Sequence, residues 1–249
     1  MIGLAIVTYN RPEYLQQVLD GVEKHLIDLI DVLVIVNDGS TADYSNVKMP
    51  EKAHYIEQEN GGVAKAKNAG LKYLMDKGCK YLFIAEDDII PKDRGAIVQY
   101  IAVSRFTGCH HLMFAHHGAG NVDKRLAVRE NVYEVFPACV GAWCYYSRAA
   151  IEKVGYMDEN FINAWEHVEH THRIAKENMC PPFGHYMDVY DSTQYLMEIP
   201  GSIEDSSIRT DTRWQQRILN GLYYWRKKDP IAFPLDHTVK DLEAGKWIV

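Results

Sequence analysis

Residues 81–88 read YLFIAEDD, in which a short apolar run is followed directly by the acids Glu86, Asp87 and Asp88. Such a run is typical of a strand buried on both faces, as in a parallel sheet. Three adjacent carboxylates repel one another, so folding alone gives little reason to place them at its end. A divalent cation, Mg²⁺ or Mn²⁺, supplies a reason because it binds oxygen ligands. For an isolated triplet, a solvated acidic turn is the simpler explanation.

The chain before this stretch alternates between strand and helix patterns. This order predicts βαβ units and a mostly parallel central sheet flanked by helices, an α/β fold. Each polar, glycine-rich cluster falls where a strand ends, which is the edge at which open α/β sheets bind ligands. The first part of the chain is therefore expected to be a nucleotide-type binding half. The expected strands are Ile2–Val7, Val32–Val36, His54–Ile56 and Tyr81–Ala85, with helices from Pro12 and from Gly62 to about Met75.

The chain after residue 96 is less regular. Residues 201–212 are polar and rich in turn formers, which predicts a mobile loop. The tail, Trp214–Val249, is aromatic and partly basic. The expected elements before it are helices at 97–106, Arg148–Val154 and Glu166–Asn178, and strands at His111–Ala115 and Val132–Phe136.

The composition excludes several classes of protein. With 47% hydrophobic and 24% charged residues in 249, the chain is globular rather than disordered. A net charge of −7 argues against a protein that coats nucleic-acid phosphates. No apolar stretch is long enough to span a membrane, and the opening residues lack the features of a signal peptide. Five cysteines without a C-x-x-C pair indicate reduced thiols and a cytoplasmic location.

Two further turns carry polar groups suited to a nucleotide. Asp38 follows the second strand, where its carboxylate can accept hydrogen bonds from a pyrimidine imide or from ribose hydroxyls. Taken alone, an ordinary Asp-Gly turn explains it better. Gly61 opens a helix that carries Lys65 and Lys67 on its first turns, an arrangement that suits an anion. A solvated helical face explains the lysines equally well.

The order and spacing of these pieces resemble a family 2 glycosyltransferase with the GT-A fold, over roughly residues 2–178. The resemblance implies metal-dependent transfer of a sugar from a nucleotide-sugar, a UDP-sugar, to an acceptor hydroxyl, with inversion. The blocks that carry it are Thr8-Tyr9-Asn10-Arg11, Asn37-Asp38-Gly39-Ser40, Asn60 to Gly70, Glu86-Asp87-Asp88, Gly141 to Phe161 and Trp165-Glu166-His167-Val168-Glu169.

The resemblance also implies roles for individual residues. Asp38 would contact the nucleotide base and Lys67 the diphosphate. Asp88 would bind the metal, Mn²⁺ or Mg²⁺, with His185 as a late histidine that completes the site. His116 and His117 are expected to be structural or to bind acceptor. The remaining residues expected at the nucleotide-sugar are Thr8, Tyr9, Arg11, Gly61, Glu86 and Asp87.

The catalytic base is where the sequence departs from the family. The family usually has Glu-Asp-x-Asp at Glu166–Glu169, so His167 occupies the position of the base. Histidine has a suitable pKa for this role and is preferred here. Glu166 and Glu169 remain alternatives, with His167 then binding the acceptor.

We expect a single domain over residues 1–249. It comprises a nucleotide-sugar half at 1–115, an acceptor half at 116–200, and a loop and tail at 201–249. The acceptor is a carbohydrate or another hydroxyl compound; nucleic acid is not expected, although a modified nucleobase stays open. Trp143 and Trp165 flank the acceptor side, although tryptophans at such spacing more often belong to the core. The aromatic and basic run 223–228 closes over the acceptor, joins a homodimer interface or binds an anionic acceptor.

Three other functions were weighed. A sugar-phosphate nucleotidyltransferase usually has a glycine-rich loop after its first strand, and the segment after Val7 has none. A non-catalytic carbohydrate-binding scaffold is suggested by His167, but the intact acidic triplet argues against decay. A zinc hydrolase is suggested by His167 and His170, although the spacing falls one residue short of H-x-x-E-H.

Overall fold

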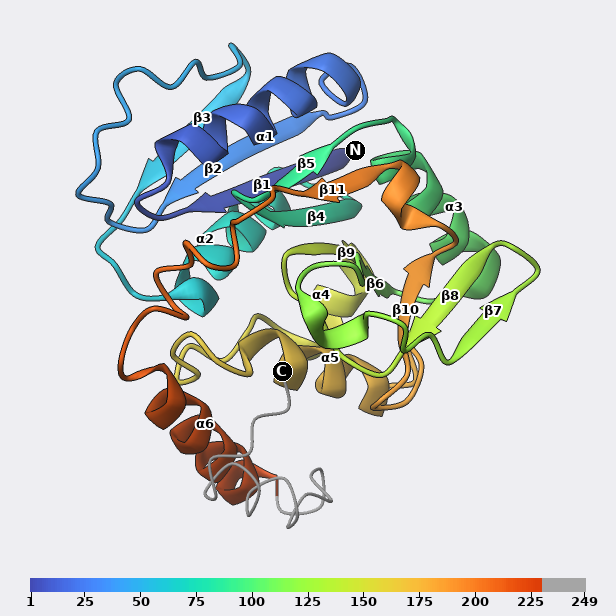
Figure 1. Cartoon of the computed structure of the whole chain (residues 1–249). Helices are drawn as coiled ribbons and strands as arrows, with labels where there is room; N and C mark the ends of the chain where they lie inside the picture. The colour runs from blue at the N-terminus through green and yellow to red at the C-terminus, as the bar shows by residue number, and fades with distance from the viewer. Residues whose placement is uncertain (230–249) are drawn as a thin grey trace.

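A six-stranded sheet forms the centre of the protein, which a computed structural model describes over residues 1–229 (Figure 1). The remainder of the predicted tail, residues 230–249, lies outside the described residues. The strand order is β3-β2-β1-β4-β9-β6. The strands are β1 (Ile2–Thr8), β2 (Val32–Asn37), β3 (Ala53–Glu57), β4 (Tyr81–Glu86), β6 (His111–Met113) and β9 (Trp143–Ser147).

The first four strands of this order run parallel, as the alternation of strand and helix patterns predicts. Strand β9 then pairs antiparallel with β4, and β6 antiparallel with β9. The α/β prediction is confirmed, and the sheet is mixed because one antiparallel strand is inserted. Apolar residues fill β1 and β4 because both strands lie inside the sheet and are covered on both faces.

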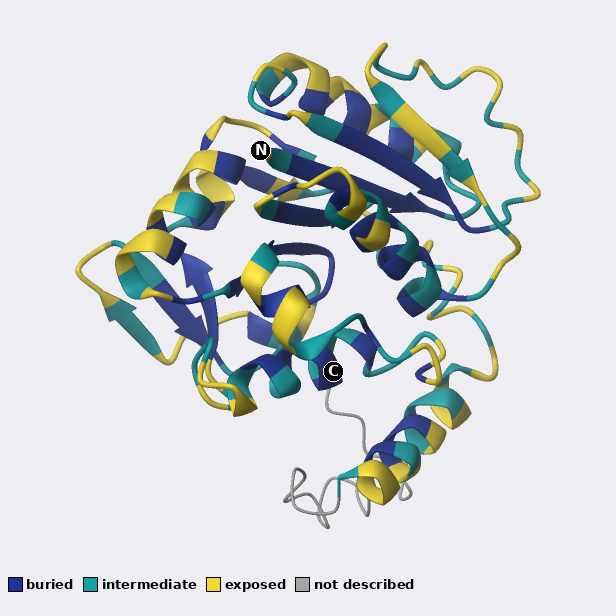
Figure 2. Cartoon of the chain, turned by 180° about the vertical axis from the view of Figure 1, so that it is seen from behind, coloured by how far each residue is buried: buried dark blue, intermediate teal, exposed yellow. Residues whose placement is uncertain are grey.

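The described residues form helices that connect the strands, and a last helix that lies away from the sheet. They are α1 (Pro12–His25), α2 (Val63–Asp76), α3 (Gly95–Thr107), α4 (Arg148–Val154), α5 (Glu166–Lys176) and α6 (Trp214–Lys228). Helix α1 begins at Pro12, and the residues it buries recur every three or four positions. Helix α2 lies close against β1, since a Cβ on Gly70 would stand 2.6 Å from the Cβ of Ala5. Figure 2 shows the buried faces of these elements turned towards the sheet.

Short strands bring the later part of the chain back to the acidic triplet. One group is β10-β8-β7, formed by β7 (Ala127–Arg129), β8 (Tyr133–Phe136) and β10 (Tyr186–Val189). The other pairs β11 (Leu196–Glu198) with β5 (Ile89–Pro91), the strand directly after the triplet. The amide of Ile199 then donates to the carbonyl of Asp88 at 2.9 Å. The segment after β11 is therefore delivered to the carboxyl end of β4.

That segment, residues 201–213, is a succession of turns, in agreement with the predicted loop. The aromatic stretch after it forms α6, which extends away from the sheet beside α5 (Figure 1). Within residues 1–229, none of the helices combines the length and apolar character that crossing a membrane requires.

Candidate active site

A cleft of about 950 Å³ opens at the carboxyl ends of the parallel strands. Its volume falls in the range of small-molecule sites. The ends of β1 and β4, the start of α2, the first turn of α5 and the loop 201–213 all contribute to its walls. The predicted site residues that line it are Thr8, Tyr9, Arg11, Asp38, Glu86, Asp87, Asp88, Glu166 and His167.

The acid triplet ends β4 with each carboxylate against a different partner. Glu86 accepts a hydrogen bond from the ammonium of Lys67 at 2.5 Å. Asp87 accepts from the hydroxyl of Thr8 at 2.7 Å. Burial raises the pKa of Asp87 to about 7, and the neighbouring Asp88 adds to the rise while Arg11 opposes it. The triplet is thus an organised part of the cleft and not a solvated turn.

Arg11 joins the triplet to the loop above it. Its guanidinium lies 3.4 Å from Asp87 Oδ1 and 3.1 Å from Asp88 Oδ2, and it also donates to the carbonyl of Ser202 at 2.9 Å. The predicted neighbour of the nucleotide is therefore a cation held between two buried carboxylates and the loop. Nothing in the sequence pattern pointed to Ser202, because 191 residues separate it from Arg11.

His117, which follows β6, is the histidine that meets Asp88. Its Nε2 lies 3.5 Å from Asp88 Oδ2. Within residues 1–229, Nε2 of His117 and Oδ1 of Asp88 are both buried without a hydrogen-bond partner. Burial raises the pKa of Asp88, but His117 and Arg11 lower it below its usual value. Within the described residues there is no cluster of three or more His, Cys, Asp or Glu side chains that could hold a metal. Asp88, with one oxygen unbonded, and His117 could supply at most a few ligands to a divalent cation, as magnesium-type ions accept when substrate phosphates complete the shell.

His185 does not join this group. Its side chain is exposed and faces a second, very small pocket near Thr171 and Met187, away from the cleft. The two metal ligands expected from the sequence are therefore not brought together. The physical reason is topological: His185 precedes β10, which belongs to the sheet β10-β8-β7, whereas His117 follows β6 in the central sheet.

Asp38 organises the glycine turn that opens α2. Its Oδ1 accepts from Gln58 Nε2 at 2.7 Å and from the amide of Gly61 at 3.1 Å, and its Oδ2 accepts from the amide of Gly62 at 2.9 Å. Gly62 has φ +86°, a conformation that favours glycine. The carboxylate predicted to contact a base thus shapes the wall on which a nucleotide would rest.

Lys67 lies beneath the cleft and not within it. Its side chain is 1% exposed, and its ammonium is held by Glu86 and by the carbonyl of Gly141 at 2.9 Å. Burial lowers the pKa of Lys67, but Glu86 and Glu166 raise it above its usual value. Lys67, the cation expected at the diphosphate, is therefore paired with Glu86. Its position on a helix did not reveal this pair.

The first turn of α5 forms the opposite wall. Trp165 precedes it with φ +70°, and its indole donates to the carbonyl of Ile218 on α6 at 3.0 Å. Glu166 is buried, and its Oε1 lies 3.0 Å from Nδ1 of His167. Burial raises the pKa of Glu166, but His167 and the charge of Lys67 bring it below its usual value. Within the described chain, Glu166 Oε2 has no hydrogen-bond partner.

The other side chains named on this helix point away from the cleft. Both oxygens of Glu169 accept from Nε of Arg173 at 3.0 Å, and Lys228 on α6 lies 2.9 Å from Oε1. His170 is fully buried and its Nε2 lies 2.8 Å from the carbonyl of Gly155. The structure thus uses Glu169 to join α5 to α6, because a buried carboxylate needs cationic partners.

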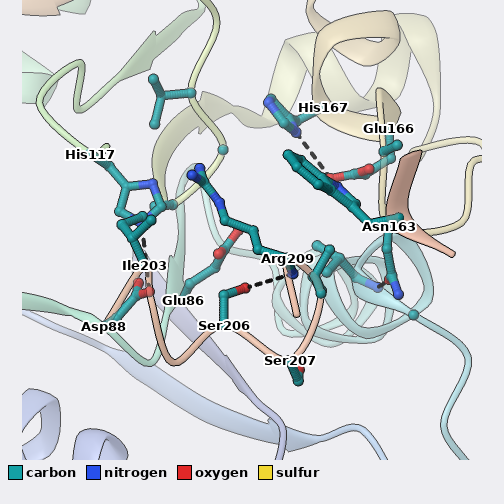
Figure 3. Close-up of a pocket in the computed structure, with 18 of the residues that line it drawn as sticks. Glu86, Asp88, His117, Asn163, Glu166, His167, Ile203, Ser206, Ser207 and Arg209 are labelled. Carbon is teal, nitrogen blue, oxygen red and sulfur yellow. Dashed lines mark hydrogen bonds and ion pairs between the residues drawn. The ribbon is translucent and has the colours of Figure 1, made fainter. Parts of the chain in front are cut away.

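The two tryptophans expected on the acceptor side lie in different parts of the structure. Trp143 lies in β9 and is fully buried in the core, whereas Trp165 lines the cleft. Loop residues that sequence reasoning did not place in the site also line it, among them Ile203, Ser206 and Arg209 (Figure 3). Their polar, turn-forming composition was the only signal, and it predicts a loop without saying where the loop lies.

Comparisons with known proteins concern the family and the fold. Residues 4–101 match the family model described as Glycosyl transferase family 2. The chain is 31% identical over 166 residues to Glycosyltransferase GlyA of Streptococcus pneumoniae serotype 4, which covers 57% of this chain and 23% of that protein. It is 21% identical over 227 residues to the uncharacterized glycosyltransferase R363 of Acanthamoeba polyphaga mimivirus, which covers 84% and 86%. The chain thus spans less than a quarter of the pneumococcal relative.

Solved structures share the fold at low sequence identity. The mannosyltransferase PcManGT from Pyrobaculum calidifontis, solved with GDP-Man and Mn²⁺, has a TM-score of 0.59 at 16% identity, over 99% of this chain and 69% of that one. TarS 1–349 of S. aureus has a TM-score of 0.52 at 13% identity, over 98% and 78%. The fold is that of the GT-A glycosyltransferases, and the match to the family 2 model spans residues 4–101.

Proposed function

We propose that this chain is a family 2 glycosyltransferase that moves a sugar from a UDP-sugar to an acceptor hydroxyl, with a divalent cation and with inversion. One observation carries the proposal. Within residues 1–229, two buried carboxylate oxygens lack a hydrogen-bond partner, Asp88 Oδ1 and Glu166 Oε2. Both residues line the cleft, and Figure 3 shows them on opposite sides of it. Leaving a buried carboxylate oxygen unpaired is costly, which is a reason to expect a partner in the working complex.

On the first wall, Asp88 and His117 are the residues that would hold Mn²⁺ or Mg²⁺. When bound, the ion would neutralise charge on the diphosphate of the donor. The chain's own contribution is to keep the Asp88 carboxylate ionised, since the guanidinium of Arg11 lies 3.1 Å from it and lowers its pKa. The complex of PcManGT with GDP-Man and Mn²⁺ supports a nucleotide-sugar and a divalent cation in proteins of this fold.

On the second wall, the geometry favours Glu166 over His167 as the base. The imidazole of His167 has an acceptor on each side, Glu166 Oε1 at 3.0 Å and the carbonyl of Cys139 at 3.4 Å. Each ring nitrogen of His167 already faces a protein oxygen, so neither nitrogen is directed at a substrate. The free oxygen belongs to Glu166, and His167 holds that carboxylate in place. Our proposal therefore moves the base from His167 to the residue before it.

The reaction then runs as a single displacement. The acceptor oxygen attacks the anomeric carbon while its proton passes to Glu166 Oε2. The bond from the anomeric carbon to the diphosphate oxygen breaks, and its electron pair leaves with the nucleoside diphosphate. Because Glu166 and Asp88 lie on opposite sides of the cleft, attack and departure occur on opposite faces of the sugar, which gives inversion.

The nucleotide would lie against the turn that Asp38 organises. The carboxylate holds the amides of Gly61 and Gly62 at the start of α2. UDP is proposed from the family resemblance, with GDP as the alternative to be measured beside it.

Thermal unfolding with nucleotide and metal tests the proposal. UDP with Mn²⁺ should raise the melting temperature, because a ligand that binds only the folded state stabilises it. UDP with a chelator, Mn²⁺ alone, and GDP with Mn²⁺ are the controls. An unchanged melting temperature at millimolar UDP and Mn²⁺, with no response to GDP either, would refute a nucleotide-sugar donor. Equal transfer activity with and without chelator would refute the metal requirement.

A further inference from the structure

Four arginines line the cleft, and three of them already have carboxylate partners. Arg11 lies against Asp87 and Asp88. Arg213 and Arg217 share the carboxylate of Asp211, at 3.1 Å and 2.9 Å. The fourth is Arg209, for which no ion pair is found within residues 1–229. The cleft thus contains one guanidinium that is not neutralised by the described part of the chain.

The side chain of Arg209 projects into the cleft. Figure 3 shows it extending from the loop 201–213 into the space between His117 and His167. Its Nη2 stands 3.5 Å from where a Cβ on Gly118 would be, so it reaches the residue next to His117. Its guanidinium carbon lies 5.8 Å from the centre of the ring of Trp214, the first residue of α6.

The loop that carries Arg209 is fastened to the nucleotide side of the cleft. The hydroxyl of Tyr14 on α1 donates to Asp205 at 2.6 Å, and Arg11 donates to the carbonyl of Ser202 at 2.9 Å. The amide of Arg209 itself lies 3.4 Å from the hydroxyl of Ser206. These contacts fasten the loop to this side of the cleft, while Arg209 itself remains exposed and accessible to a ligand.

We propose that Arg209 is a catalytic residue that contacts the departing diphosphate. The inference rests on the proposed function, which creates a negative leaving group beside His117. Lys67, the cation expected there, is buried and held by Glu86, so it cannot reach a ligand without breaking that pair. Arg209 is the guanidinium that remains, and its planar fork can donate two parallel hydrogen bonds to phosphate oxygens.

Arg209 takes no part in proton transfer. As the bond between the anomeric carbon and the diphosphate oxygen breaks, the electron pair stays on that oxygen and its charge grows. A donor that meets this charge stabilises the transition state more than the ground state. Removing one such preorganised donor typically lowers turnover by about 10²–10³.

Comparing binding of UDP and UMP separates this role from others. Isothermal titration in constant Mn²⁺ would use the whole chain as wild type, Arg209→Ala, Arg209→Lys and Arg129→Ala. Arg129 is an exposed arginine on β7 and serves as the matched control. We expect Arg209→Ala to weaken UDP by about ten-fold or more, as expected for a lost charge-assisted hydrogen bond, and to leave UMP unchanged. Arg209→Lys should fall between, because it keeps the charge without the fork.

Each of the other possible results contradicts one part of the proposal. If Arg209→Ala binds UDP as the wild type does, or loses UMP as strongly as UDP, Arg209 does not contact the diphosphate. If Arg209→Ala leaves nucleotide binding intact but raises the KM of an acidic acceptor, the arginine serves the acceptor and the inference is overturned. If the wild type binds neither UDP nor GDP, the proposed function itself fails.

Discussion

The end of β4 and the first turn of α5 both bring carboxylates to the cleft, but they treat them differently. At the end of β4 the acids form ion pairs with cations. Lys67 pairs with Glu86, and Arg11 pairs with Asp87 and Asp88. On α5 the two glutamates differ. Glu169 is neutralised by Arg173 and Lys228, whereas the hydrogen-bond partner of Glu166 within residues 1–229 is its neighbour His167, with Lys67 acting on it through charge.

The difference shows that charge alone does not mark the chemistry. Glu169 is as deeply buried as Glu166 and belongs to the same helix, yet its pairs are complete. The residues that stand out are those with one oxygen left over, Asp88 on β4 and Glu166 on α5. A buried carboxylate oxygen without a hydrogen-bond partner is a better guide to the site than charge, because leaving such an oxygen unpaired costs free energy.

The largest effect should come from the base on α5. We expect Glu166→Gln to lower the transfer rate by about 10²–10⁴ while UDP binding stays almost unchanged, since proton transfer is lost and donor contacts remain. His167→Asn should cost less, because it keeps a polar side chain beside Glu166. Single-turnover rates with titrated UDP affinity measure both. A greater loss in His167→Asn would return the base to His167.

The next effect concerns the metal side of β4. Asp88→Asn should remove the part of the UDP stabilisation that depends on Mn²⁺, about 2.7 kcal/mol at a ligand concentration 100 times Kd. Glu86→Gln should be milder, because Glu86 is occupied by Lys67. Thermal unfolding with Mn²⁺ and with chelator gives the difference. If both variants keep the full Mn²⁺ effect, the triplet does not hold the ion.

Replacing Glu169 should lower the stability of the protein and leave its transfer rate almost unchanged. Glu169→Gln leaves Arg173 and Lys228 without their carboxylate, so we expect the free energy of unfolding to fall by about 1–3 kcal/mol with little change in transfer rate. Glu177→Gln breaks only an exposed pair with Lys153 and should change stability by less than about 0.5 kcal/mol. Urea unfolding measures both. A hundred-fold loss of rate in Glu169→Gln would place it back in the cleft.

The smallest effect is a difference in pH dependence between two buried acids. Asp188 on β10 accepts four hydrogen bonds, and burial raises its pKa to about 7. The folded state keeps a proton that the unfolded chain releases, so stability falls as pH rises from about 4 to about 7. Asp188→Asn should therefore gain relative to wild type over that window, by no more than about 1.4 kcal/mol per pH unit.

Glu166 should show the opposite sign. Its pKa is lowered in the folded state, so its stabilising contribution is present above its ordinary value of 4.5 and is lost as pH falls through the folded value. Urea unfolding without metal, between about pH 2.5 and about pH 7.5, covers both titrations and gives both curves. Parallel slopes for Asp188→Asn and Glu166→Gln would mean that the two carboxyls are held alike, and the contrast drawn here would be wrong.

The sequence predicted the regular part of the fold because its signals are local. Strands β1, β2 and β4 and helix α4 were predicted to within about a residue, since apolar runs and turn formers sit next to one another in the chain. Strand β9 was missed: its apolar run was recognised only as part of a family segment. Helix α6 was missed because its apolar face is short and aromatic.

The types of residue in the candidate site could be predicted from the sequence, but the contacts between them could not. Adjacent residues such as Glu166 and His167 come together by sequence alone, and the triplet on β4 needs only its strand. The pairs Asp88–His117, Arg11–Ser202 and Glu169–Lys228 join distant segments, so their geometry depends on the finished fold. His185 was preferred over His117 for the same reason.

Strand β9 has a consequence for how this chain can be recombined with its relatives. It covers the edge of β4, and Phe83 in β4 packs against the rings of Trp143 and Tyr145 in β9. A fragment that stops after the family-matched residues 4–101 would leave that edge unpaired and Phe83 uncovered, which invites aggregation. Chimaeras that exchange the C-terminal part of this chain with that of a relative should therefore cross over after Ser147, so that β4 keeps the strand that covers its edge.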